Sequence, residues 1–172
     1  MQSLVVCEYD IRMTPVPAYM NTRRGQIAYH ESGHVLLARL LCVNVDLVSI
    51  DGLDENREGV TASAISTPHN NALIARGGMC GEFLGIPELV QERLEQINSG
   101  QTRLGFGFDM ANIEQSDAAC RSCTPEQHNH EAKRLMETHI EELHNLAGVL
   151  FRKGKLTGNE EIDRARRGEP SA

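Results

Sequence analysis

Hydrophobic residues recur at three- and four-residue steps through most of the chain, a period that predicts a mainly helical protein. The first such segment follows Asn21 and Thr22, either of which can cap a helix, and continues to about Cys42. The residues that share one face of this helix are Ile27, His30, His34, Leu37 and Leu41. Two histidines therefore lie on an otherwise apolar face.

Further helices have recognisable start and stop signals. Thr67 can cap a helix with Pro68 at its first position, and the paired glycines of the sequence ARGGMCGEFLGI indicate close packing against a neighbour. A capping box from Thr124 to Gln127 begins what we expect to be one long helix that ends at Gly154. Other helices are predicted at residues 87–98, at 109–120 after a loop at 99–108, where Asp109 caps or opens the helix, and at 159–167.

Strand signals lie in residues 45–65, where Val and Ile alternate with polar residues on both sides of a turn rich in Asp, Gly and Asn. This segment predicts a small β-hairpin or edge sheet. We therefore expect a mainly α (α+β) protein with one domain over residues 21–167. Residues 1–20 are expected to form an extended lead-in, and residues 168–172 a tail.

Composition excludes several classes of function. The chain of 172 residues carries a net charge of -7 and only 4% aromatic residues without Trp, so it would repel phosphate and offers few rings for stacking on nucleic-acid bases. Five cysteines, an odd number, in a chain without a signal sequence indicate a cytoplasmic protein. The apolar runs are shorter than the roughly 18–20 residues that cross a bilayer, so no membrane insertion is expected.

The sequence HESGH at residues 30–34 indicates metal chemistry. In a helix, His30 and His34 can direct imidazole nitrogens at one ion about 2 Å away. Glu31 is rotated by about 100° from His30 and can reach a metal-bound water without binding the metal. These are the two ligands and the general base of an HExxH hydrolase with Zn²⁺ as cofactor, and burying them without a metal would be costly. Gly33, which is unfavourable inside a helix, indicates that another element approaches the backbone there.

A third zinc ligand cannot be chosen from spacing alone, because no HExxHxxGxxH continuation follows the motif. The candidates are Glu82, Asp109, Asp117, His128, His130, His139 and His144. A separate group in CRSCTPEQHNH could hold a second, structural zinc through Cys120, Cys123, His128 and His130. Its two histidines are too close together for the usual zinc-finger arrangement, so we favour cysteines that pack beside a helix cap.

Five segments, in the same order, resemble the peptidase domain of the FtsH-type membrane-bound AAA zinc metalloproteases over roughly residues 25–165. They are AYHESGHVLLARL, VSIDGLDENREGVT, ARGGMCGEFLGI, GFGFDMANIEQ and EAKRLMETHIEELHNLAGVLFRKGKLTGNEEID. The resemblance implies a helical zinc-peptidase domain in which Asp109 is the third zinc ligand beside His30 and His34. It implies that Glu31 is the catalytic base. It also implies that Glu82 supports a metal ligand without itself binding the metal.

The chain departs from the family pattern at several positions. Ser32 and Met79 stand where an alanine and an arginine are usual, GFGF replaces the residues before the aspartate, and residues 87–98 replace a short link. Neither a GxxxxGKT/S motif nor a membrane-spanning run is present, so we expect this chain to lack the family's ATPase module and transmembrane helices. The family's hexameric ring depends partly on that module and is not implied, although an oligomer is compatible with the sequence.

The sequence therefore predicts a zinc metallopeptidase that hydrolyses unfolded or extended polypeptides without an ATPase of its own, and it leaves room for a separate ATPase as partner. An extended substrate would add as a further strand to residues 58–64, EGVTASA. The alternative is a catalytically degenerate module of the same fold that binds zinc or peptide as an adaptor or regulator.

Overall fold

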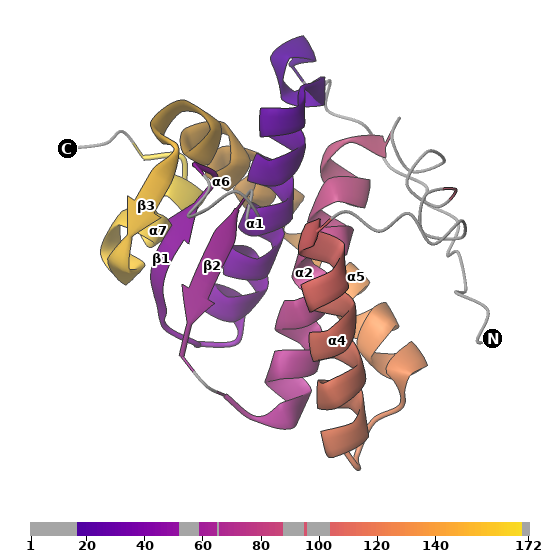
Figure 1. The fold of residues 1–172 in the computed structure, drawn as a ribbon. Coiled ribbons are helices and arrows are strands. Elements are labelled where there is room, and N and C mark those ends of the chain that lie inside the picture. The colour runs from indigo at the N-terminus through magenta and orange to yellow at the C-terminus, as the bar shows by residue number, and fades with distance from the viewer. Residues whose placement is uncertain (1–16, 52–58, 65, 88–94, 96–103, 170–172) are drawn as a thin grey trace.

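A bundle of helices with a small antiparallel sheet at its side makes up the fold (Figure 1). The computed structural model describes residues 17–51, 59–64, 66–87, 95 and 104–169. Over these residues the prevalence of helix and the single small sheet confirm the mainly α (α+β) class. The expected lead-in is described from residue 17 onward, where the short 3-10 helix η1 (Ala18–Asn21) already buries Met20 in the core.

Thr22 and Thr67 cap the two central helices, as predicted. Helix α1 spans Arg23–Leu40 and helix α2 spans Pro68–Gly85. Each threonine hydroxyl accepts a hydrogen bond from a backbone N–H in the first turn of its helix, which satisfies a donor that the helix itself leaves unpaired. Helix α1 ends slightly before the expected Cys42, whose φ of 58° is left-handed.

Glycines bring α1 and α2 into backbone contact. A Cβ atom added to Gly77 would lie 2.6 Å from the carbonyl oxygen of Gly33, and a Cβ atom on Gly33 would collide with the carbonyl of Gly77. Gly81 meets the backbone of Tyr29 in the same way. The close packing predicted from these glycines is confirmed, and it places side chains of α2 directly against the HESGH face of α1.

The predicted hairpin is confirmed, and a third strand extends it. Strand β1 (Val45–Ser49) pairs antiparallel with β2 (Val60–Ser63) on one side and with β3 (Lys155–Thr157) on the other, which gives the order β2-β1-β3. The sequence did not indicate β3, because three residues are too few to show an alternating pattern. In this sheet β2 is an edge strand.

Helix α4 (Leu104–Ala119) begins earlier than predicted. The expected loop is wrong for residues 104–108, and Asp109 lies inside the helix instead of capping it. Each glycine in a helix costs about 1 kcal/mol, but packing of α4 against α2 outweighs this propensity. The helix expected at residues 87–98 and the remainder of that loop lie outside the described residues, apart from Pro87 and Glu95.

The single long helix predicted after Thr124 is wrong, because the structure has two helices there. The capping box is confirmed, but α5 spans Pro125–Thr138 and α6 spans Ile140–Lys153. Between them His139 leaves the helical conformation with φ -115° and ψ 30°, and its imidazole pairs with a carboxylate in the first turn of α6. The break lets α5 pack on α2 while α6 packs on α1. Helix α6 ends at the left-handed Gly154, as predicted.

Helix α7 (Gly158–Arg166) closes the described chain close to its predicted position. The core lies between α1, α6 and the inner face of the sheet, and its fully buried side chains include Leu36, Leu37, Val48, Leu146, Leu150, Leu156 and Ile162. In the part of the chain that the structure describes, each helix is too short or too polar to cross a membrane.

Candidate metal centre

His30 and His34 lie on one face of α1, as the helical spacing predicts, and each is only 8% exposed. Gly78 on α2 leaves room for their rings, because a Cβ atom at that position would lie 2.6 Å from His34 Nε2 and would also overlap the ring of His30. The helix packing therefore encloses both imidazoles in a space that a larger residue on α2 would fill.

The outer nitrogen of each ring faces a group that only accepts hydrogen bonds. His34 Nδ1 lies 2.7 Å from the carbonyl oxygen of Ile74, and His30 Nδ1 lies 2.9 Å from Glu82 Oε1. Each Nδ1 therefore carries a hydrogen and donates it, which leaves the lone pair of a neutral ring on Nε2. The two Nε2 atoms are 3.2 Å apart.

Asp109 on α4 faces both Nε2 atoms. Its Oδ2 is 2.9 Å from His30 Nε2, and its Oδ1 is 3.4 Å from His34 Nε2. Ligand atoms of a tetrahedral zinc, at about 2.0–2.2 Å from the ion, are about 3.4 Å from one another. The three side chains thus have the separations of a zinc ligand set, and they come from two helices that are distant in the sequence.

Opposite charges dominate the electrostatics of this cluster. Burial lowers the pKa of His30, but Asp109 and Glu82 outweigh burial and hold that pKa well above its usual value. Burial also lowers the pKa of His34, and the charge of Asp109 more than compensates and raises it. The pKa of Asp109 lies far below its ordinary range, because the two histidines overcome the opposing effect of burial. The carboxylates therefore stabilise positive charge at the two imidazoles.

A zinc ion fits these residues. Asp109 Oδ2 is buried and faces His30 Nε2 at 2.9 Å. Two imidazole nitrogens and a carboxylate that face one another need a proton or a metal ion between them, and this donor set is typical of catalytic zinc with a position left for water.

Glu31 lies beside the three converging side chains without being one of them. It is 6% exposed, and its Oε2 accepts a hydrogen bond of 2.8 Å from Thr61 Oγ1 on the edge strand β2. Its negative charge contributes to the raised pKa of His34, after the larger effects of burial and Asp109. A carboxylate next to the ligands is suited to accept a proton there.

Glu82 is the one other candidate ligand that contacts this centre, and the remaining candidates lie elsewhere. Glu82 contacts His30 Nδ1 from behind, in the supporting position that the resemblance implies. Asp117 and His128 bond to each other in a separate cluster, and His130 is exposed. His139 pairs with Glu142, and His144 pairs with Tyr29.

Three groups of the centre were not predicted from the sequence: Thr61, the carbonyl of Ile74 and the space at Gly78. Gly78 belongs to a glycine pair that signalled close packing without indicating against which side chains. Thr61 lies in a predicted strand whose alternation left open which face meets the histidines. A backbone carbonyl such as that of Ile74 has no sequence signal.

Neither a protein-family model nor a curated protein matches this chain. Its function is therefore inferred from the residues of the centre and their geometry.

Proposed function

We propose that this protein is a zinc-dependent metallopeptidase that hydrolyses peptide bonds in unfolded or extended polypeptides. One observation carries the proposal: ligand atoms of His30, His34 and Asp109 lie within 4.8 Å of one another, and the carboxylate of Glu31 lies beside them. Two imidazoles and a carboxylate leave a coordination position open, as zinc hydrolases require. The resemblance to the FtsH-type zinc metalloproteases supports the same ligand set.

Each polar group has a role in this proposal. Zinc bound here would lower the pKa of a water molecule and polarise a substrate carbonyl. Glu31 would accept a proton from that water and return it to the leaving amine. Thr61 positions Glu31 through the hydrogen bond to Oε2, and Glu82 orients His30 through Nδ1. With each of His30, His34, Glu31 and Asp109 at most 8% exposed, the protein shields the reacting atoms from bulk water.

The edge strand β2 offers a binding mode for the substrate. It pairs with β1 along one edge, and no other described strand pairs with its second edge. An extended polypeptide can add along such an edge through backbone hydrogen bonds, with little dependence on its sequence. Because Thr61 of β2 contacts Glu31, a chain bound along β2 would pass close to the base.

An edge strand binds extended backbone, so folded substrates need prior unfolding. For these we propose a separate ATPase as the partner that unfolds them. Among the described residues, Cys42, Cys120 and Cys123 are free thiols, which favours a reducing, cytoplasmic location.

A second candidate function is a catalytically inactive module that binds zinc or peptide as an adaptor or regulator. The surroundings of Glu31 favour it: Thr61 occupies one carboxylate oxygen, and a Cβ atom added to Gly59 would lie 2.5 Å from the other. A carboxylate so closely covered by Gly59 and Thr61 has restricted access to a water molecule.

Hydrolysis of casein, which is unfolded, tests the proposal. We expect the zinc-loaded protein to cleave casein, to lose this activity on chelation and to regain it with Zn²⁺, while a stably folded protein of similar size stays intact. A zinc-loaded protein that leaves casein uncut would instead support the inactive module.

A further inference from the structure

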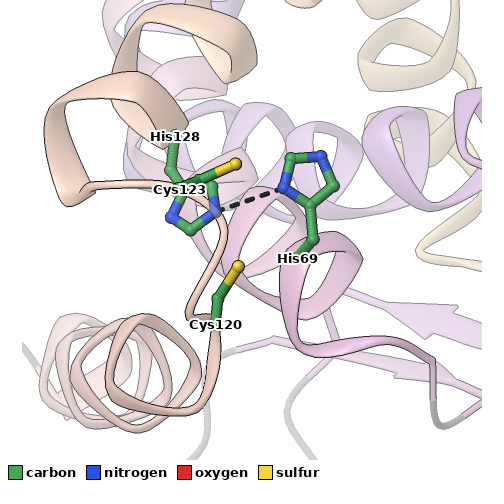
Figure 2. A group of neighbouring side chains, drawn as sticks. All are labelled: His69, Cys120, Cys123 and His128. Carbon is green, nitrogen blue, oxygen red and sulfur yellow. Dashed lines mark hydrogen bonds between the residues drawn. The ribbon is translucent and has the colours of Figure 1, made fainter.

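We infer that the protein holds a second, structural zinc ion through His69, Cys120, Cys123 and His128. Figure 2 shows these four side chains grouped where the turn between α4 and α5 meets the first turn of α2. One ligand atom from each lies within 4.8 Å of the other three. Two thiolates and two imidazoles are a common ligand set of closed, tetrahedral zinc sites.

The hydrogen bonds of His128 direct its free lone pair into this cluster. His128 is fully buried, and its Nδ1 lies 2.8 Å from Asp117 Oδ1, a carboxylate oxygen that can only accept. Nδ1 therefore donates its hydrogen, and the lone pair of a neutral ring lies on Nε2. A carboxylate behind a histidine in this way is typical of zinc ligands.

His69 faces the cluster with Nδ1, whereas His128 faces it with Nε2. Its Nε2 lies 3.5 Å from Glu131 Oε2, which favours a hydrogen on that nitrogen, and its Nδ1 lies 3.2 Å from His128 Nε2. Two imidazole lone pairs at that distance repel each other unless a proton or a metal ion lies between them. The separation is close to the roughly 3.4 Å expected for two nitrogen ligands of a tetrahedral zinc.

The two cysteines favour a metal ion over a shared proton between the nitrogens of His69 and His128. A proton shared by the two rings has no need of sulfur, yet Cys120 and Cys123 both direct a sulfur atom toward the facing nitrogens (Figure 2). Each thiol loses its proton on binding zinc, so two thiolates balance the charge of Zn²⁺ and the neutral rings add none. A site without net charge is compatible with the burial of Cys120 and His128.

A partly buried ion pair between Arg76 and Asp117 positions the ligands of the second site. Arg76 on α2 is 2% exposed and donates from Nη2 to Asp117 Oδ2 at 2.7 Å, so it orients the carboxylate that in turn orients His128. Arg76 Nε also donates to Asn129 Oδ1 on α5 at 2.6 Å. This network and the zinc would together anchor α4 and α5 on α2. Because α4 carries Asp109, the second ion would help to keep that residue opposite His30 and His34.

Cobalt substitution tests this site independently of peptidase activity. The protein is depleted of zinc by a chelator and refilled with Co²⁺ alone. Thiolate ligands give a cobalt charge-transfer absorption band, whereas the histidine and carboxylate ligands of the first centre do not. We expect this band in the wild-type protein, with the intensity of one thiolate-bound cobalt per chain. Its absence from the cobalt-loaded wild type would overturn the proposal, and no substitution is needed to see it.

Substitutions then assign the ligands. We expect Cys120→Ser/Cys123→Ser to abolish the band and to lower the zinc content of the untreated protein by one ion per chain, while Cys42→Ser, at an exposed thiol, changes neither. His69→Ala should weaken cobalt binding at least tenfold, and His130→Ala, at the exposed histidine that spacing alone suggests, should not. A band that survives the double cysteine substitution would contradict the assignment. His34→Ala should leave the band intact, so failure of this site and failure of the first centre give different results.

Discussion

His34 Nδ1 lies 2.7 Å from the carbonyl oxygen of Ile74, and this contact fixes which nitrogen of the ring faces Asp109. The carbonyl can only accept, so the lone pair of a neutral His34 must lie on Nε2. Glu82 imposes the same arrangement on His30. The protein thus directs both Nε2 atoms and a carboxylate at one position before any ion binds, which lowers the cost of ordering the site on metal binding.

Loss of a zinc ligand should remove one zinc ion per chain. We expect His34→Ala and Asp109→Ala to lose one zinc relative to the wild type, because each deletes an atom of the converging set. Glu31→Gln should retain all the zinc. The control is Glu114→Ala, an exposed position on the same helix as Asp109. Zinc per chain is measured by elemental analysis after dialysis, and full zinc in Asp109→Ala would move the third ligand elsewhere.

Thr61→Val should slow peptide hydrolysis without loss of zinc. The substitution keeps the shape of the side chain but removes the hydroxyl that bonds Glu31 at 2.8 Å, and a hydrogen bond to a charged group contributes about 1.5–3 kcal/mol. We expect kcat to fall roughly tenfold, while Thr61→Ser retains the hydroxyl and most of the activity. If Val and Ser behave alike, Thr61 does not position the base through its hydroxyl.

Gly33→Ala should destabilise the protein strongly. The new methyl group would collide with the backbone of Gly77, and overpacking of this kind costs about 1–3 kcal/mol. Gly148→Ala is the matched control, since a Cβ atom there would meet only the flexible end of Arg152 at 3.4 Å, and in a helix this change stabilises by about 1 kcal/mol. Denaturant unfolding measures both, and equal effects would mean that α1 and α2 are not in backbone contact.

Asp163→Asn should lower the free energy of unfolding at pH 7 by about 1 kcal/mol. Arg39 binds both carboxylate oxygens of Asp163, with Nε at 3.1 Å and Nη2 at 2.9 Å, and these hydrogen bonds hold the pKa of Asp163 below its usual value. A lowered pKa in the folded state stabilises the protein above the unfolded pKa of about 3.9, and this contribution is lost as the pH falls through the folded value.

The difference between the wild type and Asp163→Asn should therefore be full at neutral pH and shrink below about pH 4. Unfolding curves at several pH values measure it. Glu160→Gln, at an exposed position of the same helix, should show little difference at any pH. A difference for Asp163→Asn that stays constant down to pH 2 would contradict the role of the ion pair.

Local signals in the sequence were sufficient for the caps of α1, α2 and α5 and for the shared face of His30 and His34, because these depend on residues within a few positions of each other. The break at His139 was not predicted, since it is imposed by packing of α5 and α6 on different helices. Strand β3 was missed because its evidence is the pairing with β1, which is remote in the sequence.

The two proposed ligand sets show the same limit. Spacing placed His30 and His34 together, but Asp109 came from a family resemblance, because its position depends on how α4 packs against α2. In the second cluster spacing grouped Cys120, Cys123 and His128 correctly. Spacing suggested His130 as the fourth member of the cluster, whereas in the structure the fourth member is His69 of helix α2.

Our central claim is that Glu31 acts as the general base of a zinc-dependent peptidase. The most direct measurement compares casein cleavage by the wild type and Glu31→Gln in samples shown to contain equal zinc, with the products identified by mass spectrometry. The account predicts new peptide termini from the wild type and a rate at least about 100-fold lower for Glu31→Gln. Equal cleavage by the two proteins, or none by the zinc-loaded wild type, would contradict it.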